Sequence, residues 1–268
     1  MHAPATKHTI EQRNFVQSIE RGFAIIQAFG AGRTTLTISE AAQITGLTRA
    51  AARRFLLTLA HLGYVGTDGK FFWLKPRVLE LGHCYLTAQP WWRIAQPVVE
   101  DAARQTGESC SLCVLDGDEI VYVCRVAVHR IVSTNVSIGS RLPAYTTALG
   151  RVLLGQLPAR ELEQSISDAA IQKYTTQTTT NRKRLKKIIE QTNHDGYSLV
   201  NQELETGLIG LAVPITAPHG VSAALGVSVH AARVPAEEAL LRYLHILKKS
   251  AEQILAGMQW PDRNFGRG

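Results

Sequence analysis

The sequence predicts an α+β protein with two domains, a small N-terminal helical domain and a larger C-terminal domain built on an antiparallel sheet of six strands. Residues 36–65 contain two short helical patterns joined by Gly46. Six runs rich in β-branched and apolar residues follow, with helical patterns before, between and after them. With 268 residues, 45% of them hydrophobic, the chain is long enough to bury a core in each domain.

Two helices with a glycine turn are predicted near the N-terminus. Thr37 and Glu40 have the spacing of a reciprocal capping box, and Gly46 should end the helix that they start. Thr48 suits the N-cap of the second helix. Four apolar residues recur at i, i+3, i+4 and i+7 in that helix and should face the core: Ala52, Phe55, Leu56 and Leu59.

The opposite side of the second helix carries Arg49, Ala50 and Arg53, with Arg54 at its border. Guanidinium groups beside small side chains can enter a major groove and contact guanine edges or phosphates. A general interaction module with solvated arginines is the alternative. Binding to double-stranded DNA is preferred because only this interpretation gives the arginines a role.

A wing and a third helix complete this domain, which we place at residues 14–75. The run YVGTDGKFFWL has two apolar stretches around Asp68-Gly69, a dipeptide typical of tight hairpins in which both turn residues have positive φ. Upstream, Ile19, Phe23 and Ile26 keep helical spacing and should join the small core. The sequence therefore predicts a winged helix-turn-helix.

Positive charge is concentrated in the same region. The chain has 29 basic and 22 acidic residues, a net charge of +7. Residues 1–90 contribute 10 Lys or Arg against 5 Asp or Glu, and the remainder only 19 against 17. Such asymmetry favours a polyanionic partner. A lipid surface is disfavoured because no long basic amphipathic helix is present.

We expect a cytoplasmic protein without membrane contact. No signal-peptide pattern opens the sequence, and no stretch reaches the ~18 apolar residues of a membrane span. The cysteines Cys84, Cys110, Cys113 and Cys124 are too few for a disulfide framework. Cys110 and Cys113 form a CxxC motif, which keeps a zinc or cysteine redox sensor as an alternative. Strand alternation should place them on opposite faces, so we expect no metal.

The rest of the chain is expected to form a linker at residues 76–96, a domain at 97–258 and a flexible tail at 259–268. Pro76 should open a linker helix that Pro90 ends, and a second helix should run from about Pro97 to Gln105. Helices should cover one face of the sheet, leaving the other to hold a small molecule. The six strands are expected at 110–115, 120–126, 130–137, 197–203, 208–216 and 222–230. Further helices are expected at about 147–156, after Pro158, as an exposed charged segment ending at Gly196, and from Pro235.

A carboxylate site is predicted where the helix near Thr147 begins. Free amides and the positive end of the helix dipole favour an anion there, and the Thr146 and Thr147 hydroxyls add donors. Ile131, Leu149 and Val229 or their neighbours could provide apolar walls for an aromatic ring. His230 could bond a ligand hydroxyl, although a histidine paired with backbone is the alternative. Three arginines could make a second charge contact or lie at the surface: Arg125, Arg130 and Arg141.

Four segments resemble the IclR family of bacterial transcriptional regulators: FVQSIERGFAIIQAF, GLTRAAARRFLLTLAHLGYV, SIGSRLPAYTTALGRVLL and GLIGLAVPI. The resemblance runs from about residue 14 to 258 and includes the order and spacing of the segments. It is strongest to the branch controlling aromatic-acid degradation of the protocatechuate, β-ketoadipate and 4-hydroxybenzoate type, in which TRAAARRFLLTL recurs.

The resemblance implies a GAF-like effector domain that binds a small organic acid, and a homodimer or dimer of dimers on pseudo-palindromic promoter DNA. It implies DNA contacts at Thr48, Arg49, Ala50, Arg53, Arg54 and Lys70. It implies effector contacts at Ile131, Thr134, Ala148, Leu149, Asn201, Gly226 and Ser228.

The expected function is an effector-dependent activator, which could also contact RNA polymerase. Val200 and Asn201 stand where family members that sense small keto acids carry acidic side chains, so we expect an aromatic carboxylate or a dicarboxylic ring-cleavage product. A small-acid hydrolase fused to a DNA-binding unit is a further alternative. We expect no enzyme, no catalytic residue and no cofactor, because GxSxG, HExxH, GxGxxG and phosphate-loop motifs are missing from the sequence.

Overall fold

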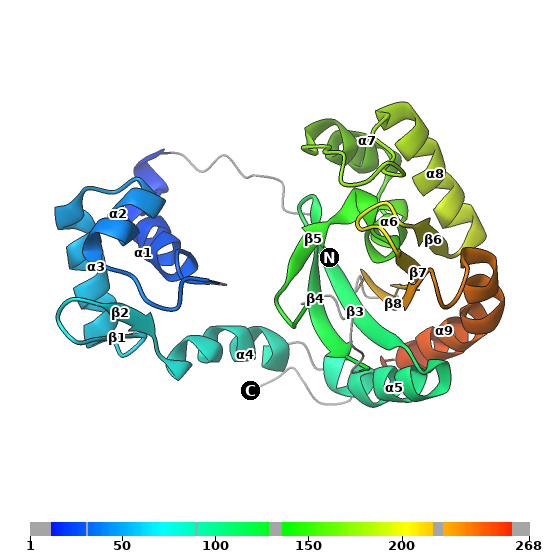
Figure 1. Cartoon of the computed structure of the whole chain (residues 1–268), viewed down its shortest axis with the longest axis horizontal. Helices are drawn as coiled ribbons and strands as arrows, with labels where there is room; N and C mark the ends of the chain where they lie inside the picture. The colour runs from blue at the N-terminus through cyan, green and yellow to red at the C-terminus, as the bar shows by residue number, and fades with distance from the viewer. Residues whose placement is uncertain (1–11, 31, 89–90, 129–135, 217–221, 259–268) are drawn as a thin grey trace, which may run out of the picture. The chain divides into compact units, whose positions relative to one another are not determined.

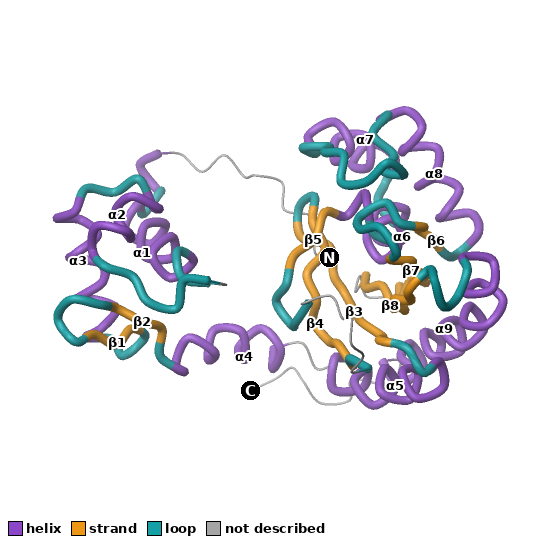
Figure 2. Tube along the Cα trace, viewed as in Figure 1, coloured by secondary structure: helices purple, strands orange, loops and turns teal. Residues whose placement is uncertain are grey.

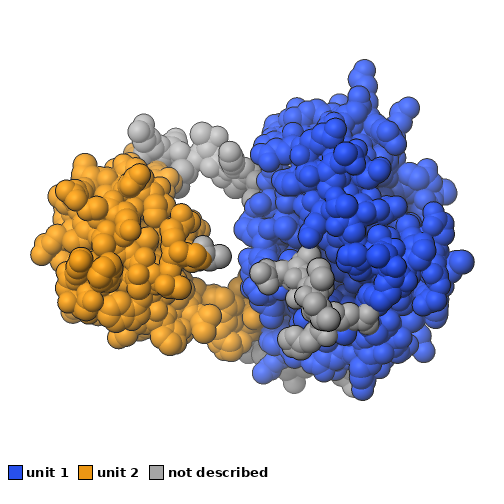
Figure 3. Space-filling view, in the orientation of Figure 1, with its two compact units in different colours: residues 1–6, 89–268 blue, residues 7–88 orange. Residues whose placement is uncertain are grey.

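The computed structural model describes residues 12–30, 32–88, 91–128, 136–216 and 222–258 (Figures 1 and 2). The chain divides into two compact units (Figure 3). In chain order, the first unit is residues 7–88, drawn in orange and labelled unit 2 in the figure, and the second unit is the part from residue 89 onward, drawn in blue and labelled unit 1. None of the helices within the described ranges has both the length and the apolar character needed to cross a membrane.

The first unit contains helices and one hairpin in the predicted order. Thr37 caps α2: its hydroxyl accepts the Glu40 amide at 3.3 Å, and the Glu40 carboxylate accepts the Thr37 amide at 2.7 Å. Gly46, at φ 67°, ends α2, and the Thr48 hydroxyl accepts the Ala51 amide where α3 begins. These predictions are confirmed. The elements are η1 (Gln12–Asn14), α1 (Gln17–Gln27), α2 (Ile38–Thr45), α3 (Arg49–His61), β1 (Val65–Thr67) and β2 (Phe72–Leu74).

The core of this unit differs from the prediction in α1. Ala52, Leu56 and Leu59 of α3 are buried as predicted, with Phe55 partly buried against them. Ile19 and Phe23 are 58% and 49% exposed, so placing them in the core was wrong. The buried residues lie at and just after the C-terminal end of α1 and are Ile25, Ala28 and Phe29. Apolar residues occupy more than one side of α1, and their spacing alone does not tell which side packs.

The wing hairpin is present, but its turn is not the expected one. β1 and β2 pair antiparallel and leave a four-residue loop at 68–71. Only Gly69 of the expected dipeptide has positive φ, at 98°. The Asp68 carboxylate accepts the amides of Lys70 at 2.9 Å and Phe71 at 2.7 Å. The loop is therefore closed by a side chain, which permits a longer turn than a two-residue hairpin.

The linker forms η2 (Pro76–Val78) followed by α4 (Leu79–Ala88), with Pro90 outside the described residues. The next helix, α5 (Trp91–Thr106), begins six residues before Pro97, so the prediction of a start at Pro97 was wrong. Trp91, Ala95 and Val99 are buried along one side of α5. This packing sustains the helix through a proline that lacks a backbone N–H. The expected boundary between residues 96 and 97 falls inside α5.

The second unit is built on one antiparallel sheet with the order β5-β4-β3-β8-β7-β6. Its first and last long strands, β3 and β8, pair at the centre, with Ser111 opposite Gly226. Most of the strand expected at 130–137 lies outside the described residues, and an unexpected short strand, β5, occupies that edge. The strands are β3 (Ser109–Asp116), β4 (Glu119–Val126), β5 (Arg141–Pro143), β6 (Ser198–Asn201), β7 (Leu208–Thr216) and β8 (Ser222–His230).

Helices cover both faces of this sheet, contrary to the prediction of one covered face (Figure 1). α5 and α9 (Ala236–Met258) pack on one face, and α6 (Ala148–Gly155) with η3 (Ala144–Thr146) packs on the other. α8 (Arg182–Asp195) packs on α6, and α7 (Ala159–Asp168) on α8. α8 is not simply an exposed charged helix, because Leu185 and Ile189 are fully buried. Each face of the sheet thus has its own apolar core.

Candidate functional site

The start of α6 is buried and closely packed. All eight residues of α6 are buried, and the Thr147 hydroxyl caps the helix by accepting the Gly150 amide at 3.0 Å. The preceding turn, η3, lies directly against Gly150, where an added Cβ would be 2.1 Å from the Ala144 carbonyl oxygen. Position 150 therefore requires glycine, and this contact fixes η3 against the first turn of α6.

A cavity of about 460 Å³ opens beside this helix start on the α6 face of the sheet. Its volume falls within the usual range for sites that hold small organic molecules, and most lining side chains are apolar. It is lined by Tyr122, Val136, Leu142, Thr146, Thr147, Ala148, Leu149, Val200, Leu204, Glu205, Leu208, Gly210, Leu211, Val227 and Ser228.

Half of the expected effector residues meet at this cavity, namely Thr146, Thr147, Ala148, Leu149 and Ser228. The lining does not include Asn201, which is exposed and accepts a bond from the Gln202 amide group. Gly226 lies beneath Leu149, because an added Cβ would be 2.9 Å from that side chain. The His230 ring instead bonds the backbone amide of Ala232. Ile131 and Thr134 lie outside the described residues.

Donors are available at one end of the cavity. Within the described residues, no hydrogen bond occupies the backbone amides of Ala148 and Leu149, the first two of α6. The Thr146 hydroxyl donates to the Pro143 carbonyl at 3.2 Å, and the Thr147 hydroxyl donates to the Ala144 carbonyl at 3.4 Å while it accepts the Gly150 amide. Contrary to the prediction, the two hydroxyls are therefore not open donors for a ligand. Unpartnered amides at a helix start attract an anion.

Tyr122 is a lining residue that the sequence analysis missed. It is 5% exposed, and burial raises the pKa of its phenol, which keeps the hydroxyl protonated and able to donate. Tyr122 pairs with Cys113 across the sheet, on the α6 face. Alternation along β4 from the buried Ile120 is the signal that could have placed it on that face.

Glu205 adds an acidic side chain that the expectation drawn from Val200 and Asn201 did not include. Val200 lines the cavity as an apolar residue, but the exposed Glu205, on the loop between β6 and β7, also lines it. Negative charge is therefore present at the rim. Glu205 lies four residues beyond Asn201, so comparing positions 200 and 201 alone did not reveal it.

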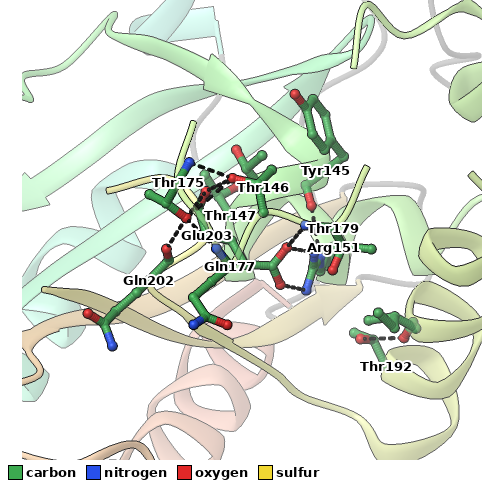
Figure 4. Close-up of polar contacts among 12 residues, drawn as sticks. Tyr145, Thr146, Thr147, Arg151, Thr175, Gln177, Thr179, Thr192, Gln202 and Glu203 are labelled. Carbon is green, nitrogen blue, oxygen red and sulfur yellow. Dashed lines mark hydrogen bonds and ion pairs between the residues drawn. The ribbon is translucent and has the colours of Figure 1, made fainter. Parts of the chain in front are cut away.

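A buried ion pair joins this loop to α6 (Figure 4). The guanidinium of Arg151 meets both carboxylate oxygens of Glu203, each at 2.8 Å, and its Nε donates to the Tyr145 carbonyl at 2.8 Å. Arg151 is 2% exposed. A charged residue within the apolar segment ALGRVLLG was a signal that a buried partner must exist, because an unpaired buried charge is unstable.

The other arginines considered for the effector differ in position. Arg141 bonds Glu119 and Asp116 in an exposed cluster, so it is a strand-edge residue. Arg125 donates to the Ser111 hydroxyl at 3.1 Å and does not line the cavity. Arg130 lies outside the described residues.

The six residues expected to contact DNA are all exposed in the first unit: Thr48, Arg49, Ala50, Arg53, Arg54 and Lys70. Arg49 donates from Nε to the Ser39 hydroxyl of α2 at 3.0 Å, which holds it at the front of α3. Arg53 and Arg54 form no ion pair within the part of the chain that the structure describes. The wing Lys70 lies 5.0 Å from the centre of the Phe71 ring. The exposed side of α3 thus carries the arginine side chains, and the wing adds the lysine.

The cysteines are separated as predicted. Cys110 belongs to the core beneath α5 and α9, and Cys113 to the core beneath α6. Burial raises the pKa of Cys110 and of Cys124 to about 11 and that of Cys113 well above its usual value. Among the described residues, no group of three or more His, Cys, Asp or Glu side chains could hold a metal ion.

Comparison with known proteins identifies the family. The IclR helix-turn-helix domain matches residues 18–69, and the C-terminal domain of bacterial IclR transcriptional regulators matches residues 83–256. The chain is 40% identical over 243 residues to the Pca regulon regulatory protein of Pseudomonas putida, spanning 90% of this chain and 84% of that protein. It is 32% identical over 257 residues to the p-hydroxybenzoate hydroxylase transcriptional activator of Acinetobacter baylyi, spanning 94% and 95%.

A solved structure also matches this chain over most of its length. A transcriptional regulator from Rhodococcus sp. RHA1 has a TM-score of 0.82 and 43% sequence identity, over 91% of this chain and 100% of that one. With both domain models matched and near-full-length relatives above 30% identity, this chain belongs to the IclR family of bacterial transcriptional regulators.

Proposed function

We propose that the protein is an effector-dependent activator of genes for aromatic-acid catabolism, which it controls from the cytoplasm by binding promoter DNA. The cavity beside the start of α6 is the observation that carries this proposal, because its lining combines the first two residues of α6, whose amides can accept an anion, with apolar side chains. The Pseudomonas relative, a regulator of the Pca regulon, and the Acinetobacter relative, an activator of p-hydroxybenzoate hydroxylase, support the choice of pathway.

The proposed effector is a hydroxylated aromatic monocarboxylate. Its carboxylate would accept hydrogen bonds from the amides of Ala148 and Leu149. Apolar lining side chains would contact the ring, and the protonated Tyr122 phenol adds a donor. Glu205 can accept a bond from a ligand hydroxyl but repels a second carboxylate. This charge disfavours the dicarboxylic ring-cleavage product that the sequence alone left open.

Calorimetry with 4-hydroxybenzoate, protocatechuate, terephthalate and β-ketoadipate tests the effector class. We expect the two hydroxylated acids to bind more tightly than the two dicarboxylates. Tyr122→Phe should weaken 4-hydroxybenzoate binding about 3- to 10-fold by removing one hydrogen bond. Tyr197→Phe, in the core on the other face of the sheet, is the matched control and should leave affinity unchanged. The effector class is wrong if none of the four binds, or if the dicarboxylates bind best.

Promoter binding is proposed to use α3 and the wing. A homodimer or dimer of dimers would present paired α3 helices to a pseudo-palindromic site. Arg53→Ala should cost about 1–3 kcal/mol of promoter affinity if Arg53 contacts a base, or flatten the salt dependence if it contacts a phosphate. Arg104→Ala, an exposed arginine on α5 paired with Asp101, is the control. Fluorescence anisotropy measures the promoter affinity and its salt dependence. If Arg53→Ala changes neither, Arg53 does not contact the promoter.

Regulation is proposed to follow from a population shift. The effector must bind one arrangement of its domain more tightly than another, and α4 would transmit the difference to the DNA-binding unit. An activator could then contact RNA polymerase. No chemical turnover is proposed, so 4-hydroxybenzoate incubated with the protein should be recovered intact by chromatography; its conversion would favour the hydrolase alternative.

A further inference from the structure

The ion pair between Arg151 and Glu203 lies behind the effector cavity rather than in it. Neither residue lines the cavity, and both are buried. Arg151 projects from the middle of α6, and Glu203 lies at the start of the loop between β6 and β7, 52 residues further along the chain. The pair therefore joins two segments that the backbone connects only over a long distance.

Both ends of the pair adjoin residues that line the cavity. Tyr145, whose carbonyl accepts from Arg151 Nε, directly precedes Thr146 and Thr147 of the lining. Glu203 directly precedes Leu204 and Glu205 of the lining. One guanidinium group thus bonds both segments that supply these lining residues, as Figure 4 shows for its bonds to the Tyr145 backbone and the Glu203 carboxylate.

Further hydrogen bonds fix the Glu203 end. Its Oε2 also accepts the Thr179 amide at 2.7 Å (Figure 4), and its carbonyl accepts the Thr178 hydroxyl at 2.6 Å. The neighbouring Gln202 has a left-handed backbone at φ 57°, and its side chain accepts the Gly207 amide at 2.8 Å. The loop that bears Glu205 is therefore held in one conformation by bonds that converge on residues 202 and 203.

An apolar pair could fill this space, so stability alone does not explain the charges. Replacing a buried ion pair with apolar residues of similar volume is often neutral or stabilising, whereas removing one partner is strongly destabilising. A planar guanidinium adds fixed direction, because its fork bonds a carboxylate at two points while Nε bonds a third group. Directional bonding fixes the distance and angle between two segments, which apolar packing does only loosely.

We infer that Arg151 and Glu203 are positioning residues of the effector site, which hold the start of α6 and the 202–207 loop at the separation that effector binding requires. This inference rests on the proposed function for its consequence in binding. Its structural part, order in the two segments, is measurable without any effector.

The experiment compares the full-length wild type with Arg151→Met, the double variant Arg151→Met/Glu203→Leu, Arg151→Lys and Arg182→Met. Arg182→Met is the matched control, because Arg182 caps the Ile166 and Ala169 carbonyls and contacts no lining residue. Thermal unfolding measures stability, hydrogen exchange of segments 144–149 and 202–208 in ligand-free protein measures order, and calorimetry with 4-hydroxybenzoate measures affinity.

Arg151→Met alone should lose stability because it leaves the Glu203 carboxylate buried and unpaired. The double variant should regain part of that stability but not all, because the Tyr145 carbonyl and the Thr179 amide still lack their partners. In the double variant, hydrogen exchange of segments 144–149 and 202–208 should still be at least tenfold faster than in wild type. Its binding of 4-hydroxybenzoate should be at least tenfold weaker. Arg151→Lys keeps the charge but not the fork, and should show the same two losses in smaller measure. Arg182→Met should retain wild-type affinity.

The inference would be overturned if a folded double variant showed the same hydrogen-exchange rates or the same 4-hydroxybenzoate affinity as the wild type. If the double variant does not fold, the same two results in Arg151→Lys would overturn it. If the wild type itself does not bind 4-hydroxybenzoate, the proposed effector is wrong while the exchange comparison still decides the positioning role.

Discussion

Gly150→Ala gives the sharpest test of how the proposed effector site is built. The new Cβ would lie 2.1, 2.3 and 2.5 Å from the carbonyl oxygen, Cα and carbonyl carbon of Ala144, where ordinary contacts exceed 3.4 Å. All three are backbone atoms, so η3 and α6 must separate. Alanine gains about 1 kcal/mol of helix propensity over glycine. Overpacking of this kind costs about 3 kcal/mol, at the upper end of the usual range.

The net expectation is a loss of about 2 kcal/mol in the free energy of unfolding, or about 4–8 °C in Tm for a domain of this size. Effector affinity should fall as well, because Thr146 to Leu149 line the cavity across the disturbed contact. Differential scanning calorimetry and ligand titration measure the two effects.

The matched control is Gly22→Ala in α1, where an added Cβ meets no atom within 4 Å. This variant should gain about 0.5–1 kcal/mol from helix propensity alone. A Gly150→Ala protein as stable as Gly22→Ala, with wild-type effector affinity, would refute the close-packing argument.

Three further predictions concern other parts of the chain. A thiol reagent at pH 8 should modify Cys84 quickly and the buried Cys110, Cys113 and Cys124 only on unfolding, because burial raises their pKa; fast modification of a second thiol contradicts this. Hydrogen bonds from Thr37 lower the pKa of Glu40 in the folded state, so its stabilising contribution is present above pH 4.5 and is lost as pH falls through the folded pKa. Glu40→Ala should therefore be less stable than wild type at pH 7, with a gap that narrows in acid; a gap independent of pH argues against the capping role. Leu56→Ala should destabilise the first unit by about 2–5 kcal/mol, measured by denaturant unfolding, and a loss below 1 kcal/mol would contradict its burial.

Features set by neighbouring residues were predictable from the sequence. The caps at Thr37, Thr48 and Thr147 each involve an amide three residues away, so a local pattern contains both partners. Alternation along β3 likewise placed Cys110 and Cys113 on opposite faces.

Features that depend on distant residues were not predictable. Arg151 and Glu203 are separated by 52 positions, and neither residue type indicates its partner. Alternation places Tyr122 on the same face as Ile120, but helices cover both faces of the sheet, and a single sequence does not specify which face contains the cavity. A local pattern also failed where one dipeptide suits two kinds of turn. Asp68-Gly69 predicted a two-residue hairpin turn, but the Asp68 carboxylate accepts the Lys70 and Phe71 amides and closes a four-residue loop instead.

The central pairing of β3 with β8 has a consequence for biosynthesis. β3 leaves the ribosome long before β8, so the sheet stays divided until nearly the whole polypeptide has been made, while the N-terminal unit can already fold. A nascent or prematurely terminated product lacking residues from 222 onward would carry the DNA-binding helices without a closed sensor. Such a fragment would also lack Val227 and Ser228, the part of the cavity lining that β8 supplies.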